Sequence, residues 1–234
     1  MARKRKKKGV QTAARKLVTS INTRSVVSEQ FRTIRTNINF SMPDRELKTI
    51  LFTSSDPGDG KSTVAANVAV VFAQEGKRVL LVDADMRKPT VHYTFQLTNT
   101  LGLSNLLTRQ AELSDVARRS DVGLDVITCG PVPPNPAELL ASQTMNKVME
   151  DMKNKYDIII FDAPPVLSVT DAQILSNKCE GTVLVISSGD TEKAGVVKAK
   201  EALVSSQANI IGAVLNNFEM DKDHYYYQYY GNIE

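Results

Sequence analysis

The chain has 234 residues, 42% of them hydrophobic, which suits one large α/β domain with a full core. No apolar run approaches the roughly 20 residues of a membrane span, and the charged N-terminus lacks the apolar stretch of a signal peptide, so we expect neither an integral membrane nor a secreted protein. Cys129 and Cys179 form no C-x-x-C pair, and we expect both to be small core residues of a reducing compartment.

Residues 3–8 are all Lys or Arg and contribute +6 to the net charge of +3, so the rest of the chain is mildly acidic. We expect residues 1–21 to form a flexible basic arm, and an anionic membrane surface, nucleic acid or plain solvent could surround it. Lys and Arg gain about 1 kcal/mol each near anionic lipid, which favours the membrane. The arm has neither stacking aromatic residues nor a base-reading motif, which disfavours nucleic acid.

Residues 22–40 show the period of a helix with two distinct faces. Its apolar face consists of Val27, Phe31, Ile34 and Ile38. A charged row on another face consists of Glu29, Arg32 and Arg35. Taken by itself, this row is typical of a solvated surface with local ion pairs worth ~0.2–0.5 kcal/mol each, and a contact surface is the alternative.

Residues 49–63 read TILFTSSDPGDGKST, which predicts a strand, a glycine-rich loop and the start of a helix. Gly58 and Gly60 let backbone N–H groups approach a polyphosphate, Lys61 adds a positive charge, and the Ser62 hydroxyl can bind Mg²⁺. Ser55 stands where the usual spacing has a glycine, and a turn that binds nothing is the alternative. We expect a nucleoside-triphosphate loop made of Ser55, Pro57, Gly58, Asp59, Gly60, Lys61, Ser62 and Thr63.

Continuous apolar runs predict strands that are buried on both sides. They lie at residues 50–52, 79–82, 124–128, 158–161, 182–187 and 210–215, and helix-length segments separate them. Residues 64–74 are apolar on nearly every face, as in a buried helix. This rhythm predicts an α/β fold of the P-loop NTPase class, with a mostly parallel sheet between helix layers, over residues 22–217.

Polar residues at the carboxyl ends of these strands are the candidates for ligand binding. Asp83 and Asp85 follow the second run, and Asp162 follows the run at 158–161. Three carboxylates beside a triphosphate would repel it unless a divalent cation lay between them, which implies Mg²⁺. Single Asp residues at strand ends are also common helix caps and turn formers, so that alternative stays open for each.

Three other polar residues near strand ends have open roles. Arg87 and Lys88 follow Asp85 and could reach phosphates or a substrate, or only solvate a loop. Asn216 closes the last run, and its amide could read an adenine edge by donor and acceptor together, or belong to a turn.

Residues 218–234 have no structural period and carry five of the seven tyrosines of the chain. We expect a flexible tail that presents phenol hydroxyls, with packing into an aromatic patch as the alternative. The clustered residues are Tyr225, Tyr226, Tyr227, Tyr229 and Tyr230.

From about Ser25 onward, the chain resembles the bacterial tyrosine kinases of capsule and exopolysaccharide synthesis. The motifs behind this resemblance are the phosphate loop, LLVDADMRKP, IIIFDAPP, GPVPPNPAELL, EQFRTIR and the tyrosine-rich tail. The resemblance implies an ATP-dependent kinase that phosphorylates tail tyrosines, with one subunit acting on another, and that regulates polysaccharide synthesis. It also implies a cytoplasmic chain recruited to the inner face of the membrane by a transmembrane modulator, with other protein substrates.

The same resemblance implies residue roles. Lys61 and Ser62 match the Walker A motif, Asp83 and Asp85 a second Walker motif, and Asp162 the Walker B motif. Glu29, Arg32 and Arg35 match a motif that packs neighbouring subunits into a ring, which makes residues 22–40 an oligomerisation helix.

For the reaction, we hypothesise that Lys61 and the loop amides hold the β- and γ-phosphates. Ser62, Asp85 and Asp162 then hold Mg²⁺, directly or through water. Asp83 orients or deprotonates the tyrosine hydroxyl, and orientation is the larger role because an ordinary carboxylate is a weak base against a phenol of pKa about 10.

Two other functions remain as alternatives. A positioning ATPase of the plasmid-partition or septum-site type shares this fold and binds DNA or membrane, but usually has a second lysine where this chain has Asp56. A nucleotide-dependent scaffold without chemistry is the third possibility.

Overall fold

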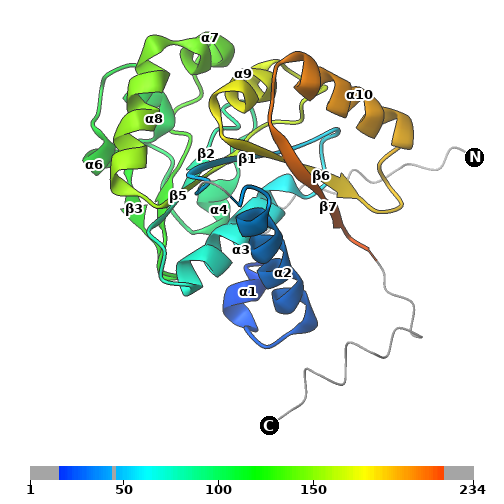
Figure 1. The fold of residues 1–234 in the computed structure, drawn as a ribbon. Helices are drawn as coiled ribbons and strands as arrows, with labels where there is room; N and C mark the ends of the chain where they lie inside the picture. Colours follow the sequence, from blue (N-terminus) through cyan, green and yellow to red (C-terminus); the bar gives the residue numbers. More distant parts are fainter. Residues whose placement is uncertain (1–15, 44–45, 219–234) are drawn as a thin grey trace, which may run out of the picture.

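The computed structural model describes residues 16–43 and 46–218, and Figure 1 shows their arrangement. A seven-stranded sheet runs in the order β3-β4-β2-β5-β1-β6-β7. Only the short β3 pairs antiparallel, with β4, and every other pairing in the described sheet is parallel. The strands are β1 (Thr49–Ser54), β2 (Val79–Asp83), β3 (Arg118–Arg119), β4 (Asp125–Ile127), β5 (Ile158–Asp162), β6 (Gly181–Ser187) and β7 (Ile210–Asn216).

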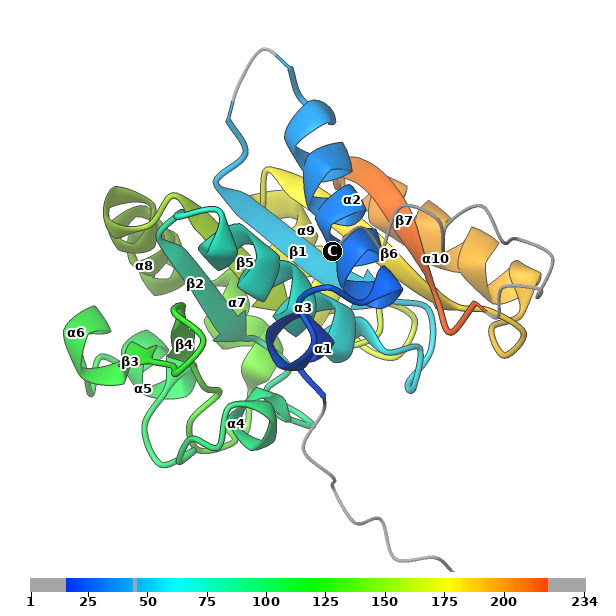
Figure 2. The same ribbon diagram turned by 90° about the horizontal axis from the view of Figure 1, so that it is seen from below.

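Helices cover both faces of this sheet. They are α1 (Val18–Ile21), α2 (Val26–Phe40), α3 (Lys61–Gln74), α4 (Val91–Thr94), α5 (Leu103–Leu107), α6 (Leu113–Val116), α7 (Pro136–Ala141), α8 (Gln143–Lys155), α9 (Asp171–Lys178) and α10 (Lys193–Ser205). In Figure 2, α1, α2 and α3 lie in front of the sheet, and α9 and α10 lie behind it. The predicted α/β architecture is confirmed.

Each central strand feeds two separate cores, as the continuous apolar runs predict. In β1, Ile50 and Phe52 join the core beneath α2 and α3, whereas Leu51 joins the core that α5 to α10 cover. Helix α3 is buried along most of its length, in agreement with its apolar sequence. Both cysteines are also buried, and burial raises the pKa of Cys179 and raises that of Cys129 to about 12, so they are core residues as expected.

Helix α2 begins at a serine cap, where Ser25 Oγ accepts a hydrogen bond of 3.1 Å from the Ser28 N–H. Of its predicted apolar face, Phe31, Ile34 and Ile38 pack on the core beside α3. Val27 is exposed instead, because it lies in the first turn, beyond that core.

The amino-terminal boundary of the folded part differs from the expected one. Thr19, which we placed in the flexible arm, is buried in α1, and its N–H and hydroxyl both donate to Asn67 Oδ1 of α3, at 3.1 and 2.9 Å. Asn67 Nδ2 in turn donates to the carbonyls of Lys16 and Thr63. A buried amide with these four bonds holds residues 16–19 on α3, a contact that local sequence cannot indicate.

The remaining arm and the tail fall outside the described residues. The basic block at residues 3–8 and the five clustered tyrosines are among them, so their predicted flexibility stays a prediction. Within the described ranges, no helix combines the length and apolar character that crossing a membrane requires.

Candidate active site

The loop between β1 and α3 has the backbone geometry of a phosphate site. Gly58 and Gly60 adopt φ values of +103° and +89°, which favour glycine. Gly60 is also the N-cap of α3, so the unpaired N–H groups of the first helical turn surround the loop and can bind an anion. A Cβ added at Gly60 would lie 2.1 Å from Asn216 Nδ2, so a larger residue there would have to displace the Asn216 amide.

Asn216 is placed against this loop by the end of β7. Its Nδ2 donates to the carbonyl of Asp59 at 3.0 Å, so the amide braces the loop backbone. Its predicted contact with adenine stays a prediction. The brace nonetheless puts the last strand of the sheet in direct contact with the candidate nucleotide site.

Asp59 shapes the interior of the loop. Its Oδ2 accepts from the Asp56 N–H at 3.1 Å and from Ser55 Oγ at 3.3 Å, and its Oδ1 accepts from Thr191 Oγ1 at 2.8 Å. The carboxylate is buried, and so is Ser55, which explains why a small polar residue suits this position. Sequence reasoning missed Thr191, because it reaches the loop from the connection between β6 and α10.

The structure brings the predicted basic and acidic groups together at the mouth of the loop. Lys61 Nζ lies 3.0 Å from Asp85 Oδ2, 3.2 Å from Asp162 Oδ1 and 3.2 Å from Ser62 Oγ. Asp83 and Asp162 are register partners on β2 and β5, and the Ala84 N–H donates to the Asp162 carbonyl at 2.9 Å. The convergence expected from the strand ends is therefore present.

Lys61 acts as the counter-ion of these carboxylates. Its side chain is only 12% exposed, and burial by itself would lower its pKa. The charges of Asp162 and Asp85 outweigh burial and raise the pKa of Lys61 above its usual value. The ammonium therefore remains charged and holds the two strand ends together.

Asp83 is fully buried and has one oxygen committed to the backbone. Its Oδ2 accepts from the N–H groups of Thr90 and Val91, at 3.0 and 2.9 Å, and so caps the start of α4. Its Oδ1 has no hydrogen-bond partner among the described residues. Burial, reinforced by the charge of Asp162, raises the pKa of Asp83 to about 8. The helix-cap alternative is thus correct for one oxygen and leaves the other for a ligand.

The acidic residues suit a magnesium ion that arrives with a nucleotide. No group of three or more His, Cys, Asp or Glu side chains in the described chain is arranged to hold a metal ion. Mg²⁺, however, usually needs only one or two carboxylates together with substrate phosphates and water. Asp85, Asp162 and the Ser62 hydroxyl supply such a set, and the buried Asp162 Oδ2 has no hydrogen bond to the described residues.

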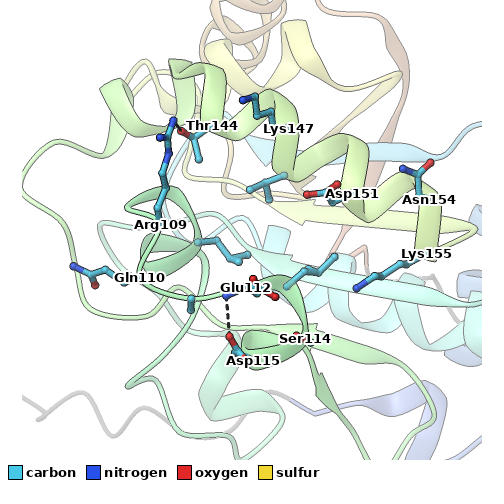
Figure 3. Close-up of a pocket in the computed structure, with 14 residues that line it drawn as sticks. Arg109, Gln110, Glu112, Ser114, Asp115, Thr144, Lys147, Asp151, Asn154 and Lys155 are labelled. Atoms are coloured by element: carbon cyan, nitrogen blue, oxygen red, sulfur yellow. Dashed lines mark hydrogen bonds between the residues drawn. The ribbon is translucent and has the colours of Figure 1, made fainter.

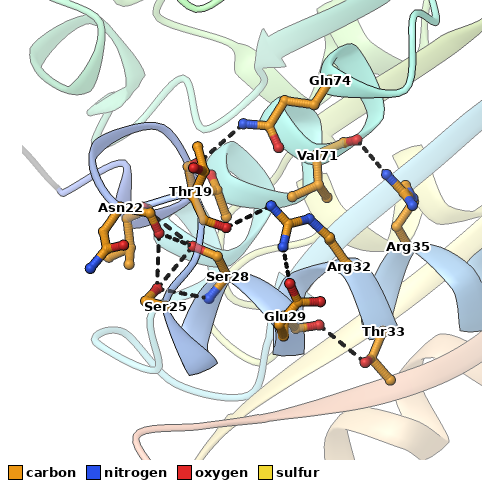
Figure 4. Close-up of polar contacts among 12 residues, drawn as sticks. Thr19, Asn22, Ser25, Ser28, Glu29, Arg32, Thr33, Arg35, Val71 and Gln74 are labelled. Atoms are coloured by element: carbon orange, nitrogen blue, oxygen red, sulfur yellow. Dashed lines mark hydrogen bonds and ion pairs between the residues drawn. The ribbon is translucent and has the colours of Figure 1, made fainter. Parts of the chain in front are cut away.

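The charged row of α2 divides into an outward and an inward part (Figure 4). Glu29 is 63% exposed and pairs with Arg32, which also donates to the carbonyl of Thr23 at 2.6 Å. Arg35 is only 19% exposed, and its Nη1 donates at 2.9 Å to the carbonyl of Val71, near the end of α3. Arg35 therefore satisfies one of the last carbonyls of α3 in its own chain. The role of the row between subunits stays a prediction.

A large groove lies away from this centre. It has a volume of about 980 Å³ and runs between α5, α6 and α8, with Leu106, Leu113 and Val148 among its apolar residues. Charges of both signs, such as Arg109 and Asp151, line it as well (Figure 3). No residue of the phosphate loop and none of the strand-end aspartates contributes to it.

Comparison with known proteins gives consistent results along most of the chain. The sequence model of a family described as an AAA domain matches residues 47–197. The tyrosine-protein kinase YwqD of Bacillus subtilis is 51% identical over 218 residues, which cover 93% of this chain and 92% of the relative. The putative tyrosine-protein kinase CapB of Staphylococcus aureus is 45% identical over 209 residues, which cover 89% and 92%.

Solved structures agree with the sequence relatives. The crystal structure of the chimerical protein CapA2B2 has a TM-score of 0.84 and 43% identity, over 87% of this chain and 90% of that one. The septum site-determining protein MinD of Pyrococcus horikoshii shares the fold, with a TM-score of 0.63 and 24% identity over 75% and 72%. The P-loop NTPase fold is confirmed, and the similarity to tyrosine kinases exceeds that to the septum-site protein.

Proposed function

Because this chain belongs to the family of bacterial tyrosine-protein kinases, we propose that it transfers the γ-phosphoryl group of ATP to the tyrosines of its own tail, one subunit acting on another. The acceptors are Tyr225, Tyr226, Tyr227, Tyr229 and Tyr230. The observation that carries the proposal is the cluster in which Lys61 Nζ lies within 3.2 Å of both Asp85 and Asp162 at the mouth of the phosphate loop.

Lys61 changes partners when the nucleotide binds. A triphosphate in the loop offers the ammonium several negative oxygens, and Asp85 and Asp162 then become available to the metal ion. Phosphoryl transfer depends mainly on positioning and on neutralising charge, and this exchange provides both. Ser62, Asp85 and Asp162 would hold Mg²⁺ together with the nucleotide, and the ion would supply charge neutralisation at the phosphates. Meanwhile the loop amides hold the phosphates, and Asn216 holds the loop backbone in place.

Asp83 receives the tyrosine hydroxyl. The two backbone hydrogen bonds to Oδ2 fix the carboxylate, and Oδ1 accepts the hydrogen of the phenol as the phenol oxygen bonds to the γ-phosphorus, the bond from that phosphorus to the β–γ bridging oxygen breaks and ADP leaves. Burial raises the pKa of Asp83 to about 8, so the carboxylate form, which accepts this hydrogen and is more basic than an ordinary carboxylate, predominates only above that pH. Both orientation and proton acceptance are therefore open to this residue.

Subunits associate through α2, and Glu29 is the member of the charged row that is best exposed to a neighbour. Phosphates on the tail, each adding about −1.5 to −2 charges, then loosen the assembly by repulsion. A transmembrane modulator recruits the kinase to the inner face of the membrane, where the basic arm contacts anionic lipid. There it regulates capsule or exopolysaccharide synthesis and acts on other proteins of that machinery.

A phosphotransfer assay tests the central step. The purified chain is incubated with γ-labelled ATP and Mg²⁺, with and without the cytoplasmic tail of a modulator, and phosphotyrosine is detected by blotting. We expect label on the tail, none in Lys61→Met, and a severe loss in Asp83→Asn. The exposed Asp121→Asn is the matched control for the second variant.

Replacing the five tail tyrosines by Phe should remove most of the label while nucleotide binding persists. Tyr93→Phe, an exposed tyrosine outside the tail, is the control and should retain the label. ATP hydrolysis without any phosphotyrosine would refute the proposal and would favour a positioning ATPase. Full autophosphorylation by Asp83→Asn would refute only the role of Asp83.

A further inference from the structure

An ion pair between a half-exposed arginine and a fully buried aspartate joins the two loops that carry the acidic residues of the site. Arg87 lies in the segment that follows β2, and Asp171 is the first residue of α9, after the segment that follows β5. Arg87 Nε donates to Asp171 Oδ2 at 2.9 Å, and Arg87 Nη2 donates to Asp171 Oδ1 at 3.0 Å. The guanidinium thus takes both carboxylate oxygens in the bidentate geometry that arginine favours.

Burial makes this pair unlike an ordinary surface salt bridge. The Asp171 side chain is completely buried, whereas that of Arg87 is partly exposed. A buried carboxylate that loses its partner is strongly destabilising, so the pair holds Arg87 in one place. A lysine would keep the charge but could not reproduce the two parallel hydrogen bonds.

The Arg87–Asp171 pair joins the two segments that carry the proposed metal ligands Asp85 and Asp162. Asp85 precedes Arg87 by two residues, and its Oδ1 accepts from the Lys88 N–H at 3.0 Å, so Asp85 is bonded into the same short turn. Asp162 begins the segment that leads to Asp171. The backbone bond from Ala84 to Asp162 ties the two segments at their start, and the Arg87–Asp171 pair ties them farther out.

We infer that Arg87 is a positioning residue that fixes Asp85 relative to Asp162, through its bidentate bond to Asp171, for binding of the magnesium–nucleotide complex. This inference rests on the proposed function in assigning Asp85 and Asp162 to the metal. In this assignment Arg87 neither binds a phosphate nor only faces solvent, the two alternatives that the sequence left open, because its guanidinium is bonded to Asp171. Residues behind metal ligands commonly alter metal affinity when they are replaced.

The strands provide a matched control at their opposite ends. Arg78 precedes β2 and Asp157 precedes β5, and the two residues form a second pair that is more exposed than the first, with Arg78 Nη2 2.6 Å from Asp157 Oδ1. This second pair joins the same strands at their amino ends, far along the strands from Asp85 and Asp162. Variants of this second pair therefore show whether loosening the strands in general has the same effect as breaking the Arg87–Asp171 pair beside the site.

The test measures the affinity of a fluorescent ADP analogue in the full chain while Mg²⁺ is titrated. Arg87→Lys and Asp171→Asn should each raise the Mg²⁺ concentration for half-maximal binding by about tenfold. Binding in EDTA should stay unchanged in both. The double variant should be no worse than either single variant, because both remove the same contact. Arg78→Lys and Asp157→Asn should leave the Mg²⁺ midpoint unchanged.

Other outcomes would overturn the inference. If Arg87→Lys weakens binding equally in EDTA while Asp171→Asn has no effect, Arg87 contacts the phosphates directly. If the control pair shifts the Mg²⁺ midpoint as much, the effect is general stability. The proposed function is judged separately by phosphotyrosine formation in the unmodified chain, so unchanged midpoints beside normal phosphorylation would refute the positioning role alone.

Discussion

Replacing Lys61 by Met should destabilise the protein in the absence of nucleotide, in addition to abolishing phosphotransfer. The ammonium lies 3.0 Å from Asp85 and 3.2 Å from Asp162, and each contact corresponds to a gross attraction of about 5 kcal/mol at an effective dielectric constant of roughly 20. Desolvation of the three groups offsets most of this. Removal of one partner from a buried ion pair nevertheless costs about 3–5 kcal/mol net.

The assay is thermal unfolding in EDTA. For a domain of this size, about 1 kcal/mol corresponds to roughly 2–4 °C, so we expect the melting temperature of Lys61→Met to fall by about 10 °C. Lys200→Met, at an exposed position on α10, is the control and should stay within about 2 °C.

Magnesium provides the second half of this experiment. In the native chain a divalent cation must displace the ammonium from Asp85 and Asp162, whereas in Lys61→Met the two carboxylates have no cation to be displaced. Mg²⁺ should therefore raise the melting temperature of the variant more than that of the native protein. Equal melting temperatures in EDTA, together with equal responses to Mg²⁺, would show that Lys61 is not the counter-ion of these residues.

Three further measurements address other parts of the chain. Arg35→Met should lose about 2 kcal/mol of stability, because it breaks the hydrogen bond to α3. Glu29→Ala should keep its stability but form smaller assemblies in light scattering. The reverse pattern would refute an inward role for Arg35 and an outward role for Glu29. The two buried cysteines should react with a thiol reagent only as fast as the protein opens, and immediate labelling would contradict their burial. Arg78 lowers the pKa of Asp157 to about 2, so this pair should stabilise the fold fully above about pH 4 and lose its effect as the pH falls through 2. The difference in melting temperature between native protein and Asp157→Asn should accordingly shrink over that range, and a constant difference would argue against the pair.

Features that depend on neighbouring residues could be predicted from the sequence. Continuous apolar runs identify the buried parallel strands, and the strand rule places Asp83 and Asp162 at one edge. Glycine at positions 58 and 60 agrees with the left-handed backbone found there. In each case the physical cause lies within a few residues, in backbone freedom, periodicity or strand polarity.

Features that depend on distant partners could not be predicted. Thr191 reaches Asp59 across 132 positions, and Arg87 reaches Asp171 across 84. A side chain such as Arg35 has the same local pattern whether it faces a neighbouring subunit or the end of α3. The short helices α4, α5 and α6 also escaped prediction, since four or five residues are too few to establish a helical period.

Because Asn216, the last residue of β7, lies against Gly60, the tail starts beside the nucleotide loop, and this limits how far autophosphorylation can proceed. The sequence leaves the sheet at the rim of the nucleotide loop, and Tyr225 follows Asn216 by so few residues that its tether spans at most about 30 Å. A phosphoryl group on Tyr225 therefore stays within about 30 Å of the nucleotide loop of its own subunit. Like charges repel over a screening length of about 8 Å at physiological salt, so phosphates that accumulate on the tail should slow the binding of the next nucleotide. The salt concentration should determine how many phosphates are needed for this inhibition.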